Sequence, residues 1–178
     1  MKSLGLFKLV FPLLVAPAVA ATGDSRFLQF LDDSNCTSII ETICEGEYST
    51  DTLCDFLDIA GIGDEFENGT WTVFAPTDDA FDSVPIDYVN MLVGGNDTFL
   101  LMNLLAFHTV DGEALMSSDL RCDGRVSMAN EELTVTRCEG DRVYQIGLGN
   151  PITDYPEITF VDIETCNGVV HLINKVML

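Results

Sequence analysis

Residues 71–81 read Trp71-Thr72-Val73-Phe74-Ala75-Pro76-Thr77-Asp78-Asp79-Ala80-Phe81. The part from Trp71 to Ala75 is apolar on both faces of an extended chain, which predicts a strand in the middle of a sheet. Pro76 cannot donate a hydrogen bond to a neighbouring strand and predicts the end of this one. We expect Thr77 to cap a helix whose first turn holds two aspartates, where the helix dipole favours anions. Paired carboxylates are also typical of a general acid and base, but capping explains both without a substrate.

Helices are predicted on both sides of this stretch. Isoleucines at spacings of three and four indicate a helix that begins near Thr37. Caps and glycine stops indicate three more: from Thr50 or Asp51 to Gly61, from Val84 to Val93, and from Thr98 onward.

The helix after Thr98 has one apolar face, formed by Leu101, Leu104, Leu105 and His108 at helical spacing. His108 therefore ends a buried stripe. A lone histidine in such a place is more often a hydrogen-bonded core residue than a metal ligand or a catalytic base. We expect a structural role for it.

The second half of the chain alternates between apolar and polar residues as strands do. Candidate strands lie around residues 126–128, 133–135, 143–146, 158–163 and 169–173. The strongest hairpin signal is Asn167-Gly168, since both residues tolerate positive φ. Because helices mostly precede strands, the order predicts the α+β fold class.

Residues 1–20 have the features of a secretory signal peptide. Lys2 and Lys8 give a basic start, an apolar run follows, and Ala18-Val19-Ala20 supplies small residues for cleavage. The apolar run is too short to span a bilayer, and the C-terminal residues lack the spacer and tail of a lipid anchor. We expect a secreted, extracellular protein with no membrane span. Residues 21–35 would be a linker and residues 36–178 a single domain.

Six cysteines lie after the leader, an even number that suits disulfides in an oxidising compartment. No Cys-x-x-Cys pair is present, and we expect no metal or other cofactor. Closeness in sequence favours Cys44–Cys54 and Cys122–Cys138, which leaves Cys36–Cys166, although other pairings are open at this point.

Three Asn-x-Thr sequons begin at Asn35, Asn68 and Asn96 and support export as a glycoprotein. The second and third lie in turn-like sequence, where a glycan reaches solvent. At Asn35 a disulfide formed by the next residue competes with glycan addition.

The chain is strongly acidic. Removing Lys2 and Lys8 leaves 6 Lys and Arg (8 − 2) against 29 Asp and Glu, a formal charge of −23. Nucleic acid and heparin-like partners are therefore disfavoured. Two interpretations remain: a solvated surface that keeps the protein soluble, or adhesion bridged by divalent cations. No Asp-x-Asp-x-Asp-Gly loop offers a dedicated calcium cage.

Three segments in order resemble the fasciclin-type domain, often called FAS1, of secreted and cell-surface adhesion proteins. Residues 72–81 match the family's first homology box almost residue for residue. Residues 104–110 match the leucine-and-histidine segment between the boxes. Residues 167–176 match the second box, with Asn167-Gly168, His171 and Ile173 in their expected places. The resemblance covers about residues 36–178.

The resemblance implies a wedge of β-strands flanked by helices, and a role in adhesion or matrix assembly with no known reaction. In animal members a tyrosine–histidine pair is associated with integrin binding, and Phe107-His108 stands there in this chain. A second recognition segment ends in Asp-Ile, matched by Asp162-Ile163. These four residues are the candidate partner-binding residues, and core packing is the alternative role for them.

We therefore expect a non-catalytic adhesion or extracellular-matrix module that binds protein or polysaccharide. A single domain binds one partner at a time, so adhesion also predicts self-association or contacts through glycans. The alternatives are a secreted hydrolase and a carrier of apolar ligands on the same scaffold. The hydrolase is disfavoured because no nucleophile elbow and no positioned set of catalytic residues is present.

Overall fold

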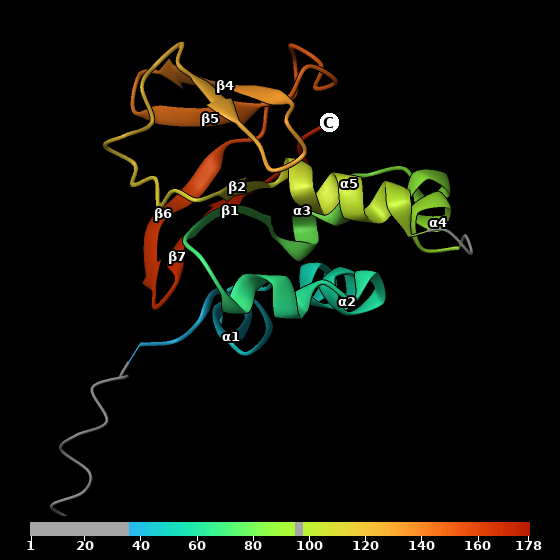
Figure 1. The fold of residues 1–178 in the computed structure, drawn as a ribbon. Helices are drawn as coiled ribbons and strands as arrows, with labels where there is room; N and C mark the ends of the chain where they lie inside the picture. The colour runs from blue at the N-terminus through green and yellow to red at the C-terminus, as the bar shows by residue number, and fades with distance from the viewer. Residues whose placement is uncertain (1–35, 95–97) are drawn as a thin grey trace, which may run out of the picture. The chain divides into compact units, whose positions relative to one another are not determined.

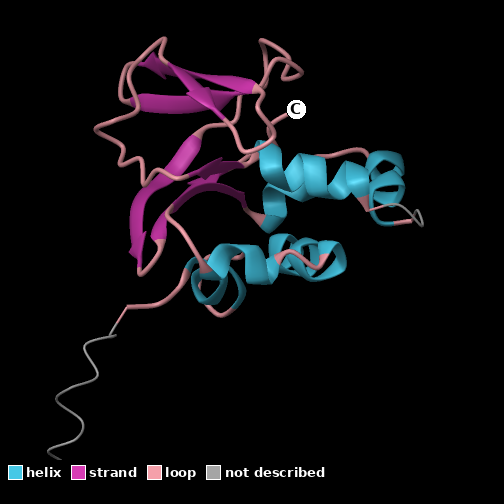
Figure 2. Cartoon of the chain, in the orientation of Figure 1, coloured by secondary structure: helices cyan, strands magenta, loops and turns pink. Residues whose placement is uncertain are grey.

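The structure, a computed structural model, describes residues 36–94 and 98–178. Helices dominate the first half of the described chain and strands the second (Figure 1), in agreement with the predicted α+β class. The strands form two sheets, and the helices gather on one side of them (Figure 2). The predicted leader and linker, residues 1–35, lie outside the described residues, which begin at the first residue of the predicted domain, Cys36.

The larger sheet has the strand order β2-β1-β7-β6. Its strands are β1 (Trp71–Pro76), β2 (Thr109–Asp111), β6 (Ile158–Thr165) and β7 (Gly168–Ile173). β1 lies between β2 and β7, as its apolar faces predict, and pairs in parallel with β7 from Trp71↔Gly168 to Pro76↔Ile173. Parallel pairing requires a long connection, and here nearly the whole second half of the chain supplies it.

The close approach of β1 and β7 depends on a glycine. Gly168 has a φ of 152°, and a Cβ at this position would lie 1.9 Å from the carbonyl oxygen of Trp71. The turn of the β6–β7 hairpin lies one residue before the predicted Asn167-Gly168 turn. Thr165 pairs with Gly168, so Cys166 and Asn167 form the connection. The glycine is needed for strand contact and not for the turn itself.

The smaller sheet contains β3 (Arg125–Ser127), β4 (Leu133–Glu139) and β5 (Arg142–Ile146), all antiparallel. Its inner face has a buried polar network. The Gln145 amide donates to Thr134 Oγ1 over 2.6 Å, and its oxygen accepts from Thr136 Oγ1 over 2.7 Å. Since buried polar groups are costly unless paired, this network favours one register of β4 against β5.

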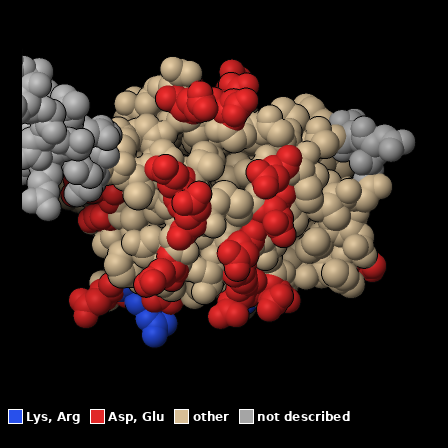
Figure 3. All heavy atoms as spheres, turned by 90° about the horizontal axis from the view of Figure 1, so that it is seen from below, with Lys and Arg blue, Asp and Glu red and all other residues tan. Residues whose placement is uncertain are grey.

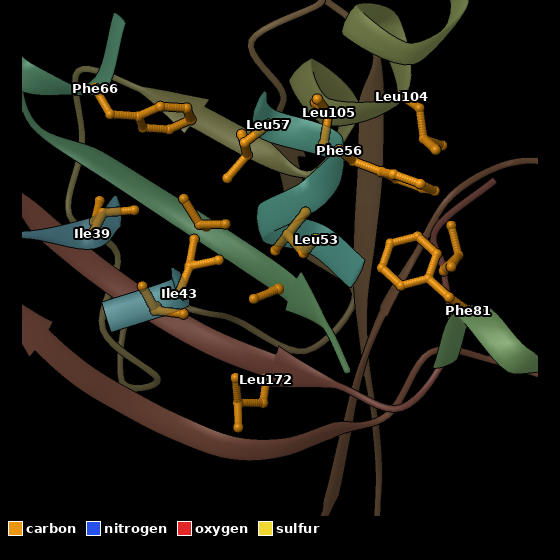
Figure 4. Close-up of a cluster of buried hydrophobic side chains, with 14 of the residues drawn as sticks. Ile39, Ile43, Leu53, Phe56, Leu57, Phe66, Phe81, Leu104, Leu105 and Leu172 are labelled. Atoms are coloured by element: carbon orange, nitrogen blue, oxygen red, sulfur yellow. The ribbon is translucent and has the colours of Figure 1, made fainter. Parts of the chain in front are cut away.

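The helices are α1 (Ile39–Cys44), α2 (Asp51–Ala60), the 3₁₀ helix η2 (Gly63–Glu67), α3 (Asp78–Asp82), α4 (Ile86–Val93) and α5 (Phe99–Phe107). Their apolar side chains meet one face of the larger sheet in a single cluster (Figure 4). Phe56 of α2 contacts Phe81 of α3 edge to face, with ring centroids 5.1 Å apart. The isoleucine stripe of α1 and the Leu104–Leu105 pair of α5 join the same cluster, as their spacing predicts.

Helix capping differs from the sequence-based expectation at three positions. Thr50, Thr77 and Thr98 stand at N-cap positions, but none of the three hydroxyls makes a capping hydrogen bond. The Asp78 carboxylate instead accepts a hydrogen bond from the backbone N–H of Thr52, over 2.8 Å, and so caps α2 from the start of α3. Asp78 therefore has a structural role on a neighbouring helix.

Three disulfides close the described fold: Cys36–Cys166, Cys44–Cys54 and Cys122–Cys138, with Cα–Cα distances of 5.3, 5.1 and 5.4 Å. These are the pairs that closeness in sequence favours. Cys36–Cys166 joins the start of the described chain to the β6–β7 hairpin, so it fixes α1 against the larger sheet.

Candidate functional site

His108 follows α5 and lies in the interior, with 3% of its surface exposed. Its Nε2 accepts a hydrogen bond from the backbone N–H of Met177 over 2.9 Å. Because that N–H can only donate, the ring proton lies on Nδ1, which donates to the carbonyl oxygen of Leu104 over 2.8 Å. Burial lowers the pKa of His108 to about 4, against the opposing effect of the hydrogen bond to Leu104. The imidazole is thus neutral and joins α5 to the C-terminal residues.

His171 in β7 has the opposite tautomer. Its Nδ1 accepts from the backbone N–H of Asp162 over 3.2 Å, and its Nε2 donates to the carbonyl oxygen of Leu115 over 2.7 Å. Burial lowers the pKa of His171, while the bond to Leu115 and the charge of Asp162 oppose the shift. Both ring nitrogens of both histidines are therefore bonded to backbone groups, which leaves no ring nitrogen without a partner.

Asp162 lies in an irregular part of β6, with a φ of 60°. Its carboxylate accepts hydrogen bonds from the backbone N–H and the hydroxyl of Ser117, over 2.6 and 2.5 Å. The two bonds to Ser117 lower the pKa of Asp162, although desolvation, the largest single influence, acts in the opposite direction. Together with His171, Asp162 holds the segment around Ser117 against the larger sheet.

The four candidate partner-binding residues have mainly internal contacts. Phe107, His108 and Ile163 are buried, and only Asp162 is partly exposed. Phe107 packs in the second apolar cluster with Phe74 and Met177. A partner cannot touch Phe107 or His108 unless the end of α5 opens. The structure thus favours the core-packing alternative for these positions.

Asn167 connects three segments that are far apart in sequence. Its Oδ1 accepts from the backbone N–H of Ile39 over 2.9 Å, and its Nδ2 donates to the carbonyl oxygen of Phe66 over 2.5 Å. Its own carbonyl oxygen accepts from the N–H of Trp71 over 3.0 Å. The asparagine of the predicted hairpin is therefore a tertiary contact between α1, η2 and β1.

An apolar hollow with a volume of about 400 Å³ lies beside β1. We call it the α5 groove. Residues from η2, β1, β2, α5 and the turn at Ala129 line it: Ile62, Glu65, Phe66, Trp71, Phe99, Met102, Asn103, Leu105, Ala106, Thr109, Asp111 and Ala129. The ring of Trp71 contacts that of Phe66 in a tilted arrangement, with centroids 5.2 Å apart. Such a hollow, apolar with a few polar groups at its rim, is typical of binding sites.

Sequence reasoning did not identify the α5 groove, because its lining comes from five separate segments. One signal was available. The helix over residues 99–107 contains a single polar residue, Asn103, so it is apolar on every side. One side packs in the core through Leu101, Leu104 and Leu105, while Phe99 and Met102 remain 67% and 41% exposed beside the groove.

Charge is distributed unevenly between the two halves. Every residue with a formal charge in the described chain before Arg121 is an aspartate or a glutamate. The described cations all follow: Arg121, Arg125, Arg137, Arg142 and Lys175. Figure 3, which views the molecule from the side of α1 and α2, shows acidic side chains spread over this face and basic atoms only at its edge. The helical half thus presents a negative potential to solvent.

Residues 36–94 and 98–178 contain no preformed cluster of metal-binding side chains. Nowhere in these ranges do three His, Cys, Asp or Glu side chains gather in a way that could hold a metal ion. In the same ranges, no helix is long and apolar enough to cross a bilayer.

Of the three sequons, only that at Asn68 lies within the described residues. Asn68 and Thr70 are exposed, in a turn with Gly69 at a φ of 101°. The indole N–H of Trp71 donates to the carbonyl oxygen of Asn68 over 3.0 Å. A glycan at Asn68 would therefore stand beside the rim of the α5 groove. Asn35 and Asn96 lie outside the described residues.

Comparison with known proteins gives one family. The family model described as the Fasciclin domain matches residues 49–178. Protein sll1483 of Synechocystis is 25% identical over 173 residues, which cover 97% of this chain and 90% of that protein. The cell surface glycolipoprotein MPB83 of Mycobacterium bovis is 31% identical over 117 residues, which cover 65% of this chain and 46% of that protein.

Among solved structures, a FAS1 domain pair from the insect cell adhesion molecule Fasciclin I matches with a TM-score of 0.53 at 20% identity. The match covers 70% of this chain and 44% of that one. This chain thus spans less than half of MPB83 and of the insect domain pair, and the structural likeness concerns the fold.

Proposed function

The chain belongs to the fasciclin domain family, and from this premise we propose that it is a non-catalytic adhesion or extracellular-matrix module that binds protein or polysaccharide partners. The observation that carries the proposal is the bonding of both histidines. Each ring nitrogen has a backbone partner within the fold, so the residues best suited to acid–base chemistry are already used to hold the scaffold. Exposed residues on this rigid scaffold would then contact the partner.

Secretion is part of this proposal. It rests on the leader-like residues 1–20, on the three disulfides, and on the exposed sequon at Asn68. The names of two similar proteins, a cell surface glycolipoprotein and a cell adhesion molecule, point to the same side of the membrane. Expression with the native leader should release a protein that begins at Ala21, and mass spectrometry of the medium measures this end and the glycan at Asn68.

The test of adhesion is retention on immobilised matrix proteins and on wall polysaccharide. The secreted protein, with its disulfides intact, should be retained on at least one surface, whereas a reduced and alkylated sample should pass through. Adding calcium or a chelator separates bridging by divalent cations from direct contact, since the acidic helical face lacks a preformed metal cluster within the described residues. A folded protein that passes through every surface in both conditions would refute the proposal.

A second candidate function, a carrier of apolar ligands, is favoured by the α5 groove. Its volume of about 400 Å³ lies in the range of small-molecule sites, roughly 300–1,000 Å³. A carrier would bind an uncharged apolar dye at Trp71 with little sensitivity to salt. The hydrolase alternative predicts turnover of ester, peptide or glycoside substrates that is lost when a named acid is replaced. We expect no such turnover.

A further inference from the structure

The uncharged polar side chains of the α5 groove already have hydrogen-bond partners within the fold. The indole N–H of Trp71 is already bonded to Asn68, the Thr109 hydroxyl donates to the carbonyl oxygen of Leu105 over 3.0 Å, and the Asn103 amide accepts from Asn130 over 3.3 Å. Apart from these groups and two carboxylates at the rim, the lining is aromatic and aliphatic. A ligand that enters it gains free energy from burying apolar side chains.

Two carboxylates stand at the rim with no partner among the described residues. The side chains of Glu65 and Asp111 form neither an ion pair nor a hydrogen bond there, and both residues are exposed. Asp111 pairs across the sheet with Trp71, and Glu65 precedes Phe66, so each acid flanks one ring of the aromatic pair. A cation bound at either carboxylate would lie next to the apolar surface.

The wider charge distribution selects the same kind of ligand. No Lys or Arg lines the groove, and none occurs in the described chain before Arg121. Acidic lipids, sulfated glycans and a second copy of this chain, with its net charge of −21, would meet a repulsive potential. A basic ligand is attracted over a distance of about 8 Å at physiological salt.

On the basis of the proposed adhesion function, we infer that the α5 groove binds a segment of a partner protein in which bulky apolar side chains are flanked by Lys or Arg. The apolar side chains enter between α5 and the Trp71–Phe66 pair. The cations pair with Glu65 and Asp111. Apolar burial supplies affinity, and the negative half of the domain supplies selection of partners and a faster encounter.

Trp71 is the only tryptophan of the chain, so its fluorescence reports occupation of the groove directly. The probe is a short synthetic peptide with leucines on one helical face and lysines beside them. Two matched peptides keep one half of the pattern each: one replaces the lysines by serine, the other replaces the leucines by serine. We expect a saturable change in emission with the first peptide, about tenfold weaker binding to each matched peptide, and about tenfold weakening at high salt.

The double variant Glu65→Gln, Asp111→Asn should weaken binding of the leucine–lysine peptide about tenfold. The matched control is Asp55→Asn, Asp58→Asn on α2, which removes the same charge at exposed positions outside the groove and should change binding less than about twofold. Met102→Gln should weaken the leucine–lysine peptide and leave thermal unfolding almost unchanged, because this side chain is partly exposed.

Several results would overturn the inference. Equal binding of the serine-for-lysine peptide would make the groove an apolar-ligand site, and equal loss in both double variants would make the attraction a property of the whole acidic face. No emission change with any peptide would refute it outright. The surface-retention assay stays separate: if the Glu65→Gln, Asp111→Asn protein is retained as well as the parent, adhesion stands and the groove is not its site.

Discussion

Lowering the pH should destabilise this domain through His108. The pKa of His108 is about 4 in the folded protein, against an ordinary value near 6.5 in the unfolded chain. Between these values the unfolded chain binds more protons than the folded one. The free energy of unfolding is therefore unaffected well above pH 6.5, falls as the pH drops through this window, and levels off below pH 4.

The structure explains the magnitude. A proton on Nε2 of His108 would face the N–H of Met177, which now donates to that atom over 2.9 Å, so charging the ring also breaks a buried hydrogen bond. From the two pKa values, the loss is about 2 kcal/mol between pH 7.5 and pH 5 and about 3 kcal/mol by pH 4. His171 acts in the same direction, because burial lowers its pKa as well.

The assay is urea unfolding followed by Trp71 fluorescence at pH 7.5 and pH 5, with all disulfides intact. The control is His108→Gln, whose amide can accept and donate but does not titrate. This variant should be less stable than the parent at pH 7.5, by about 1–2 kcal/mol, and should lose about 2 kcal/mol less on acidification. If parent and variant lose the same free energy between the two pH values, then His108 is not the buried neutral group that the structure describes.

Two further predictions each compare a pair of substitutions by the same unfolding assay. Gly168→Ala should lower the free energy of unfolding by about 3 kcal/mol, because the added Cβ would lie 1.9 Å from the Trp71 carbonyl oxygen. Gly63→Ala meets no atom within 4 Å and should raise it by about 0.5 kcal/mol. Similar losses at both glycines would contradict the β1–β7 contact. Asp78→Ala should lower the free energy of unfolding by about 1 kcal/mol, because the cap of α2 is lost. Thr77→Ala should lower it by less than about 0.5 kcal/mol, since the Thr77 hydroxyl makes no capping hydrogen bond. A larger loss for Thr77→Ala than for Asp78→Ala would instead support capping of α3 by Thr77, as the sequence predicts.

The elements that sequence predicts well are those whose signal is local. The central strand β1 follows from apolar residues on both of its faces, and the buried end of α5 follows from leucines at helical spacing. The strand β2 was not predicted; it has only three residues and exists through its pairing with β1. Short strands have little sequence periodicity of their own, and whether they form depends on the strand with which they pair.

The errors in detail have a common physical origin in contacts between distant segments. Thr77 fits the sequence rule for a cap, yet the residue that caps a helix is the next one, Asp78. Its carboxylate accepts from the N–H of Thr52 in α2, 26 residues earlier in the chain. Gly168 fits the rule for a turn, yet its absent side chain makes room for β1. Local sequence rules cannot predict the α5 groove, because no single segment contains enough of its lining to give a pattern.

Three polar residues of the motif segments stabilise the scaffold and are distinct from the residues that line the groove. His108, His171 and Asn167 each bond to backbone groups at least 56 positions away, so each closes a long loop of the chain at a defined register. Replacing them should disturb folding first. The rim acids Glu65 and Asp111 take part in none of these contacts. Substitutions in the groove can therefore change its surface while the scaffold stays intact, as expected of a fold whose function depends on surface residues.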